Sequence, residues 1–325
     1  MMAKGSARTS LLEPAPFFHD VAEGPADARA FWVQAADGTR LRMALWPGGA
    51  KATILLFPGR TEYCEKYGRL ADDLAAAGYG MAAFDWRGQG LADRPAHRAD
   101  MGHVTSFDDY RADVAAFRAA LEGLGAPKPW FLIGHSMGGA IGLRALHDGL
   151  PVQAAAFSAP MWGIAMHPAL RAISGPLLTL AVPMGMGKAF AATTGPYKVM
   201  EFDDNPLTTD RAQFDYMARQ LARYHELRLG GPSNMWLRAA LRETAALLDR
   251  PAPDVPALAL MASREKIVVN AAIERRMAAW PGGGLRTIEG AEHELLLEAP
   301  ERRQQVLAAI LSHFGAYPPE PVVVT

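Results

Sequence analysis

Short apolar runs alternate with helical patterns between residues 51 and 160, and this alternation restricts the fold more than any other feature of the chain. Each run is apolar at successive positions, which is typical of a strand buried on both faces. The segments between the runs carry apolar residues three and four positions apart, which is typical of helices. The alternation therefore predicts an α/β fold, a mostly parallel sheet covered by helices on both faces. The predicted strands are residues 52–57, 79–84, 129–134 and 152–157.

The alternation stops near residue 161 and resumes near residue 251. The stretch between is rich in Met, Trp, Gly and Pro and contains helical patterns but no predicted strand. Further strands are predicted at 257–262 and 285–288, before a terminal helix. We interpret the helical insertion as a cap, since it separates two strands of one sheet. The expected organisation is an irregular N-terminal arm (1–28), a single discontinuous core domain (29–160 and 251–317) and a helical cap (161–250).

Composition excludes several classes of function. The 33 basic and 34 acidic residues give a formal net charge of −1, so nothing indicates nucleic acid binding. Cys64 is the only cysteine, which rules out an intramolecular disulfide and favours a structural thiol. Residues 1–18 lack the apolar core of a secretory signal, and the most apolar stretch, 175–187, is too short and too broken by Pro and Gly to span a membrane. We expect a soluble cytoplasmic protein, of an oligomeric state that the sequence leaves open.

The pentapeptide Gly134–Gly138 matches the pattern G-x-S-x-G. It follows a predicted buried strand and precedes a helical pattern, which is the strand–turn–helix setting of a nucleophile elbow. Small residues are needed two positions either side of the serine, because the serine backbone is strained there. The turn lifts the hydroxyl of Ser136 clear of the sheet and towards the helix N-terminus. This motif predicts Ser136 as a nucleophile, with the backbone N–H of Met137 as an oxyanion donor.

A serine hydroxyl reacts only when a base takes its proton, and the base needs a carboxylate to orient it. In this type of site the order along the chain is serine, acid, histidine. Of the nine histidines, His293 is the one in the loop after the last predicted strand. Glu265 is the candidate acid, since it follows strand 257–262, whereas the loop one strand earlier, 158–162, has no carboxylate. The weaker rivals, too close in sequence to the histidine, are Glu289, Glu292, Glu294 and Glu298.

Other parts of the site are less constrained. The loop after strand 52–57 should supply the other oxyanion donor, and the backbone N–H of Arg60 is the candidate. No metal or cofactor is expected: His293-Glu294 begins an H-E-x-x-H pattern, but position 297 is leucine. Apolar residues of the predicted cap either pack its core or line the substrate site. The candidates for substrate binding are Met161, Trp162, Met166 and Trp236.

These motifs resemble those of the bacterial lysophospholipase and monoacylglycerol lipase branch of the α/β-hydrolase superfamily, over residues 30–315. One departure is Pro58, which stands where the branch has a histidine that helps to fix the oxyanion loop. The similar segments are the branch's HG-x-x-E…Y loop (58–62 with Tyr67), its D-x-R-G-x-G loop (84–90), its elbow (134–138), a cap segment (230–236), its acid loop (265–268) and its histidine loop (290–294).

The resemblance implies hydrolysis of lipids that carry one acyl chain, lysophospholipids or monoacylglycerols, through an acyl-enzyme at Ser136. The alternative is a broad-specificity esterase, or a serine aminopeptidase or amidase acting on small substrates. A non-catalytic ligand-binding member of the fold is a further alternative, disfavoured by the intact serine, acid and histidine. The expected partner is a small-molecule or lipid ester, and the cap is a candidate for transient contact with a membrane surface. Head group and chain length stay open.

Overall fold

The computed structural model describes residues 12–49, 51–95, 97–167, 178–180 and 182–318, and the described residues contain one eight-stranded sheet. Its order is β1-β2-β4-β3-β5-β6-β7-β8. The first two strands form an antiparallel hairpin around Asp37-Gly38, and β2 also pairs antiparallel with β4. All the remaining neighbours are parallel. The predicted mostly parallel sheet is therefore confirmed.

The strands form where the sequence is apolar without interruption. Every residue of β3, β4, β5, β6 and β7 is buried, as expected for strands covered on both faces. The edge strand β8 is instead exposed at its middle residues. The strands are β1 (Arg29–Gln34), β2 (Arg40–Trp46), β3 (Thr53–Phe57), β4 (Gly80–Asp85), β5 (Trp130–His135), β6 (Ala155–Ser158), β7 (Ala257–Ala262) and β8 (Gly284–Ile288).

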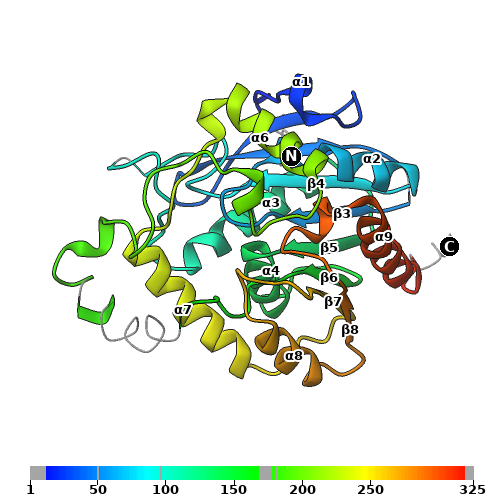
Figure 1. Cartoon of the computed structure of the whole chain (residues 1–325). Helices are drawn as coiled ribbons and strands as arrows, with labels where there is room; N and C mark the ends of the chain where they lie inside the picture. Colours follow the sequence, from blue (N-terminus) through cyan, green and yellow to red (C-terminus); the bar gives the residue numbers. More distant parts are fainter. Residues whose placement is uncertain (1–11, 50, 96, 168–177, 181, 319–325) are drawn as a thin grey trace, which may run out of the picture.

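Helices cover both faces of the sheet (Figure 1). On one side α9 lies beside α2, joined to it by an ion pair between Arg303 and Asp73. On the other side α4 packs against β3 and β5 and contacts α3. The helices are α1 (His19–Ala22), α2 (Gly68–Ala76), α3 (Asp108–Gly123), α4 (Met137–His147), α6 (Arg211–Arg223), α7 (Asn234–Asp249), α8 (Asn270–Ala278) and α9 (Pro300–Gly315). Short 3₁₀ turns are η1 (Cys64–Tyr67), η2 (Met186–Lys188), η3 (Phe202–Asp204), η4 (His225–Leu227) and η5 (Leu295–Leu297).

The chain between β6 and β7 forms helices and loops, drawn from green to yellow in Figure 1. Its helix α6 is held to the N-terminal part of the chain, since Tyr216 donates its hydroxyl to Ala22 O at 2.7 Å. Its helix α7 is held to α4 by an ion pair between Arg144 and Glu243 at 2.6 Å. Part of the apolar stretch 175–187 lies outside the described residues, as do residues 1–11 of the predicted arm. Within the described chain, no helix is long and apolar enough to span a bilayer.

A buried ion cluster joins β2 of the hairpin to the end of β4 and to η1. Arg42 of β2 has no exposed side-chain surface and lies 2.7 Å from both Glu65 and Asp85. Burial alone lowers the pKa of Arg42, but the two carboxylates outweigh it and raise the pKa well above its ordinary value. Cys64 lies beside this cluster, and burial raises the pKa of its thiol. The one thiol of the chain is thus buried and protonated, as a structural thiol is.

Candidate active site

The turn after β5 has the geometry of a nucleophile elbow. Ser136 has φ 50° and ψ −119°, a conformation that costs energy for any residue with a side chain. A Cβ added at Gly138 would overlap Phe57 O, and one at Gly139 would lie 2.5 Å from the Pro160 side chain. Glycine at these positions therefore lets α4 start directly against β3 and the loop after β6. The strained turn places Ser136 at the carboxyl end of the sheet, with Met137 as the first residue of α4.

Three sequence-predicted residues meet at this point. His293 Nε2 lies 2.9 Å from Ser136 Oγ, and His293 Nδ1 lies 2.8 Å from Glu265 Oε2. They lie in the turn between β5 and α4, the loop after β7 and the loop after β8. The other carboxylate oxygen of Glu265 accepts the N–H groups of Ile267 and Val268, at 2.7 and 3.1 Å. Both lone-pair sides of this carboxylate are therefore occupied, which fixes its orientation towards the histidine.

The negative charge of the Glu265 carboxylate is stabilised beside His293. Burial raises its pKa, but the hydrogen bonds from His293 and from two backbone N–H groups outweigh burial and hold the pKa of Glu265 below its ordinary value. A carboxylate that accepts from Nδ1–H leaves the proton off Nε2 in neutral imidazole. The unprotonated nitrogen then faces the Ser136 hydroxyl, ready to accept its proton.

The rival carboxylates are engaged elsewhere. Glu292 Oε1 lies 3.4 Å from Lys266 Nζ, and Glu294 lies 2.6 Å from Lys66 Nζ. Glu298 accepts the N–H of Glu292 and the hydroxyl of Thr209. The contact of Glu289 within the described part of the chain is through its backbone carbonyl, which accepts from Arg302. Of the glutamates considered from the sequence, Glu265 alone is hydrogen-bonded to the histidine within the described structure.

The loop after β3 is fixed by contacts that do not involve a histidine at position 58. Pro58 O accepts the indole N–H of Trp86 at 2.9 Å, and Gly59 O accepts from Gln89 Nε2 at 2.8 Å. The side-chain oxygen of Gln89 accepts the N–H of Thr61 at 3.2 Å. Glu62 accepts the N–H of Gly59. These bonds hold the loop that carries the backbone N–H of Arg60, a residue that lines two cavities together with Ser136.

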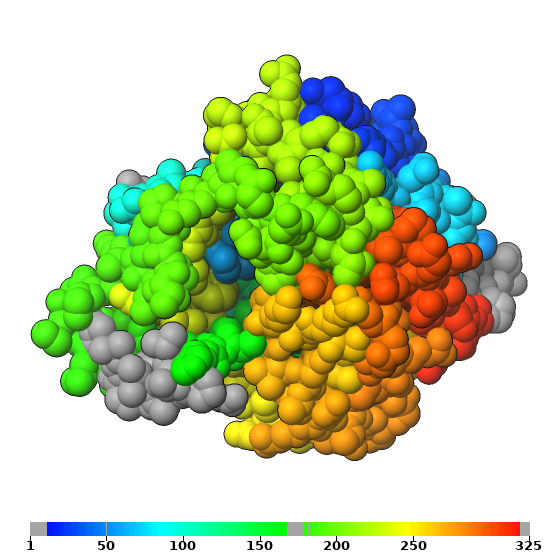
Figure 2. Space-filling view, in the orientation of Figure 1, coloured from blue at the N-terminus to red at the C-terminus, as the bar shows by residue number. Residues whose placement is uncertain are grey.

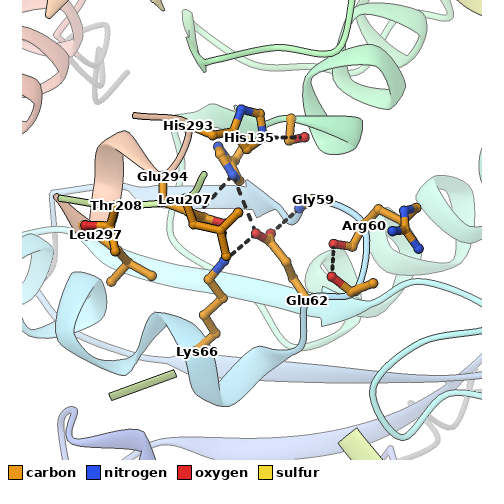
Figure 3. A network of polar contacts seen from close by, with 12 residues as sticks. Gly59, Arg60, Glu62, Lys66, His135, Leu207, Thr208, His293, Glu294 and Leu297 are labelled. Atoms are coloured by element: carbon orange, nitrogen blue, oxygen red, sulfur yellow. Dashed lines mark hydrogen bonds and ion pairs between the residues drawn. The ribbon is translucent and has the colours of Figure 1, made fainter. Parts of the chain in front are cut away.

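Four ionisable side chains lie buried behind the elbow, in a cluster that sequence reasoning missed (Figure 3). Lys66 Nζ donates to Glu62 at 2.5 Å and to Glu294 at 2.6 Å. His135 Nε2 lies 3.3 Å from Glu294 Oε2 and 3.5 Å from Glu62 Oε1, while its Nδ1 donates to Ser158 O. We call these four residues, Glu62, Lys66, His135 and Glu294, the buried quartet. It joins the loop after β3 to the loop that carries His293.

The charges of the buried quartet stabilise one another. Burial lowers the pKa of Lys66 and of His135, but Glu294 and Glu62 outweigh burial and raise both pKa values. Burial also raises the pKa of Glu294, yet Lys66 and His135 bring that pKa well below its ordinary value. Glu62, His135 and Glu294 come close enough to share a metal ion. Lys66 already supplies the positive charge between their carboxylates, so the quartet forms ion pairs within the chain.

Replacing Lys66 by methionine should destabilise the fold by about 3–5 kcal/mol, because Glu62 and Glu294 would be left buried without their ammonium partner. Unfolding in urea, followed by tryptophan fluorescence, measures the loss. The matched control is Lys266→Met, whose ion pair is 62% exposed on the lysine side and should cost about 1 kcal/mol or less. Equal unfolding free energies for the two variants would contradict this account of the buried quartet.

Three cavities meet at Arg60, and two of them also reach Ser136. The largest, of about 570 Å³, is lined by Ser136, Arg60 and mostly apolar residues of the 161–250 segment; we call it the apolar cavity. Met161, Met166 and Trp236 line it, whereas Trp162 does not. Trp162 is fully buried, donates its indole N–H to Gly139 O at 3.1 Å and packs on Phe157. The Trp162 side chain therefore supports the nucleophile elbow through its contact with the first turn of α4.

The second cavity, of about 310 Å³, continues from Ser136 and His293 between the loop after β3 and α6. We call it the passage. It shares Arg60, Thr61 and Met200 with a third cavity of about 330 Å³. Figure 2 shows this face of the molecule hollowed between the green and yellow-green surfaces, with blue atoms from the N-terminal part of the chain at the bottom of the hollow. The arrangement can hold an ester at Ser136 with its two halves in separate cavities.

Comparison with known families gives a match to residues 48–300, to the family described as serine aminopeptidase, S33. Lysophospholipase L2 of Escherichia coli (strain K12) is 34% identical over 279 residues, which is 81% of this chain and 80% of that protein. Probable lysophospholipase L2 of Haemophilus influenzae is 30% identical over 310 residues, which is 92% of this chain and 97% of that protein.

Solved structures are similar in fold. A soluble variant of monoglyceride lipase from Saccharomyces cerevisiae, bound to a substrate analogue, has a TM-score of 0.70 at 20% identity and covers 89% of this chain and 95% of its own. A thermostable carboxyl esterase from Bacillus coagulans has a TM-score of 0.71 at 14% identity, covering 90% and 99%. At these identities the structural similarity establishes the fold alone.

Proposed function

Because the chain belongs to the serine aminopeptidase (S33) family of α/β hydrolases, we propose that it is a serine carboxylester hydrolase that cleaves lipids with one acyl chain. Membership makes it a serine hydrolase, and the predicted resemblance to this superfamily is confirmed. The two curated relatives described above are a lysophospholipase and a probable lysophospholipase, which supports a lipid ester as substrate. The observation that carries the proposal is the Ser136–His293–Glu265 hydrogen-bond chain at the meeting point of the cavities.

This geometry supports the following reaction. Ser136 Oγ attacks the ester carbonyl carbon while His293 Nε2 takes the hydroxyl proton, and Glu265 stabilises the imidazolium that forms. The backbone N–H groups of Met137 and Arg60 stabilise the negative oxygen of the tetrahedral intermediate. The intermediate collapses as His293 gives its proton to the leaving alcohol, so the acyl group stays on Ser136. A water molecule, deprotonated by His293, then releases the fatty acid by the reverse sequence.

The apolar cavity suits an acyl chain. Its volume of about 570 Å³ lies in the range of small-molecule sites, and Met161, Met166, Leu178 and Trp236 are among its walls. A chain placed there leaves the alcohol half of the ester for the passage.

We treat residues 161–250 as a helical cap over the core formed by 29–160 and 251–317, with 1–28 as an arm.

The aminopeptidase alternative, suggested by the family's description, is less well supported. An aminopeptidase has to hold the protonated amine of its substrate, which requires a free carboxylate near the nucleophile. The described walls of the apolar cavity contain no Asp or Glu. In the passage the carboxylates are Glu62 and Glu294, and both are already paired with Lys66. The site therefore favours a neutral or anionic substrate.

The value of kcat/KM should rise with pH through one ionisation, since His293 has to be neutral to accept the Ser136 proton. The lowered pKa of Glu265 keeps this carboxylate charged at neutral and mildly acidic pH, so the acid limb should follow a single proton. A pH–rate profile on a soluble ester measures this. A limb that follows two protons, or one that persists unchanged in His293→Ala, would show that another group is the base.

A substrate panel tests the proposed function as a whole. Lysophospholipids and monoacylglycerols should be hydrolysed with higher kcat/KM than acetate esters, because only the longer acyl chain fills the apolar cavity. Diacyl lipids should be poor substrates, since a second chain would have to enter the passage. Turnover of aminoacyl anilides in place of these esters would overturn the proposal in favour of the aminopeptidase.

A further inference from the structure

Most buried cations of the described chain are neutralised by carboxylates. Arg42, Lys66 and Arg87 each pair with two acidic side chains. Arg94 has no carboxylate partner in the described structure, but it donates to four carbonyl oxygens. Such partners offset the free energy that is lost when the cation is removed from water. Arg276 also forms no ion pair in the described structure, but it donates to two carbonyl oxygens, Arg250 O and Leu247 O, and it lines none of the three cavities described above.

The side chain of Arg60 is different. Among the described residues it forms no ion pair, and its single hydrogen-bond acceptor is Gly230 O, 2.9 Å from Nη1. A guanidinium has five N–H donors, so most of those of Arg60 have no acceptor in the described chain. Figure 3 shows the guanidinium turned away from Glu62. Burial lowers the pKa of Arg60 to about 10, which still leaves it charged at neutral pH.

Arg60 also lies where the three cavities meet. It lines the apolar cavity, the passage and the third cavity, and Ser136 lines the first two of these. The third cavity carries two more cations, Arg228 and Lys198, and its described walls contain no Asp or Glu. We call it the cationic cavity. An anion held by Arg60 on the side of the cationic cavity would lie close to the reacting ester and would meet no carboxylate among the described walls of that cavity.

We propose that the Arg60 side chain binds the phosphate of a lysophospholipid head group, with the head group extending into the cationic cavity. This assignment rests on the proposed function, because the acyl ester of the same molecule has to lie at Ser136. A phosphodiester carries one negative charge and two free oxygens, which match the paired N–H donors of a guanidinium. In a lysophospholipid the phosphate and the acyl ester share one glycerol, so the cation has to lie close to the nucleophile, as Arg60 does.

A purely structural role for Arg60 makes a different prediction. The bond to Gly230 O and the nearby Trp236 ring, 5.9 Å from the guanidinium carbon, connect the loop after β3 to the segment before α7. If Arg60 served only as this connection, its loss would lower the hydrolysis of every ester alike. A phosphate-binding role predicts a loss that depends on the head group.

The experiment compares lysophosphatidylcholine with the monoacylglycerol of the same acyl chain, both kept below their critical micelle concentrations. The quantity measured is the ratio of the two kcat/KM values, in which a general effect on the oxyanion loop divides out. Arg60→Gln should lower this ratio by about 10- to 100-fold, the usual worth of charge-assisted hydrogen bonds to a phosphate. Arg60→Lys should lower it less, because the ammonium keeps the charge but loses the fork of donors. The matched control is Arg219→Gln, an exposed arginine of α6 that pairs with Glu23.

The outcomes separate this inference from the proposed function. An unchanged ratio in Arg60→Gln, with both substrates still hydrolysed, would overturn the phosphate site and leave the esterase intact. No turnover of either lipid by the wild-type protein would overturn the proposed function itself. Inorganic phosphate is the remaining probe, tested as an inhibitor of a neutral p-nitrophenyl ester. Competitive inhibition that vanishes in Arg60→Gln, together with an unchanged ratio of the two lipids in that variant, would assign the site to free phosphate and so overturn the head-group assignment.

Discussion

Ser136→Ala should abolish ester turnover, with a loss in kcat of up to about 10⁶, the size of effect seen when a catalytic serine is removed. The reason is chemical, since alanine has no oxygen that could form the acyl-enzyme. Water activated by His293 could still attack the bound ester directly, but without the gain from a covalent intermediate held in place. The loss should therefore fall on kcat, while binding of the acyl chain in the apolar cavity persists.

The measurement is steady-state hydrolysis of a p-nitrophenyl ester and of one lysophospholipid. Ser312→Ala is the matched control, since Ser312 lies exposed on α9, away from the cavities. A thermal melt checks that the strained turn at Ser136 still forms. Near-normal turnover by a correctly folded Ser136→Ala variant would falsify the acyl-enzyme mechanism.

Glu265→Gln should lower kcat by about 10²–10⁴ with little change in KM, because the carboxylate acts on the imidazolium of the transition state. The geometry sharpens this expectation. One oxygen of Glu265 accepts from His293 Nδ1, and the other accepts the N–H groups of Ile267 and Val268. A glutamine has one oxygen for these two sides. Its NH₂ group has to face either the histidine donor or the backbone donors, so one hydrogen bond is lost and the ring orientation loosens.

Glu292→Gln is the matched comparison, measured beside it on the same ester. Glu292 lies in the loop after β8, next to His293 in sequence, but its carboxylate is directed to Lys266. Its change to glutamine should leave kcat close to that of the wild type. Glu265→Asp should keep part of the activity if the loop can move to cover the shorter reach. If Glu292→Gln is crippled and Glu265→Gln is not, the assignment of the acid is wrong, while Ser136 and His293 keep their roles.

The fold and the positions of the three central residues were predictable because each depends on local pattern and chain order. Fully buried strands produce uninterrupted apolar runs. For this reason the strand predicted at 257–262 has the same bounds as β7. The start of β6 was less well predicted. The apolar pattern suggested residue 152, whereas the strand begins at Ala155, since Leu150–Gln153 leads into it as a connection. Apolar character does not distinguish a buried connection from a strand.

The parts of the site that depend on tertiary contact could not be predicted. Lys66 and Glu294 are 228 positions apart, so no spacing in the sequence links them. Trp162 follows Met161 directly, yet one lines the apolar cavity and the other supports the elbow. The backbone role expected for Arg60 likewise gave no indication that its guanidinium lies without a carboxylate partner in the described structure. Only the arrangement of distant segments decides these roles.

The buried quartet also constrains how this sequence can diverge. Two carboxylates, an ammonium and an imidazole lie buried in contact with one another, so removing any single charge leaves the others uncompensated. Neutral drift therefore cannot pass through the single replacements, and the members have to change together or be retained together. Since two of them adjoin Ser136 and His293 in sequence, a homologue that keeps the serine and histidine but has lost Lys66 should also lack the acidic residues at positions 62 and 294.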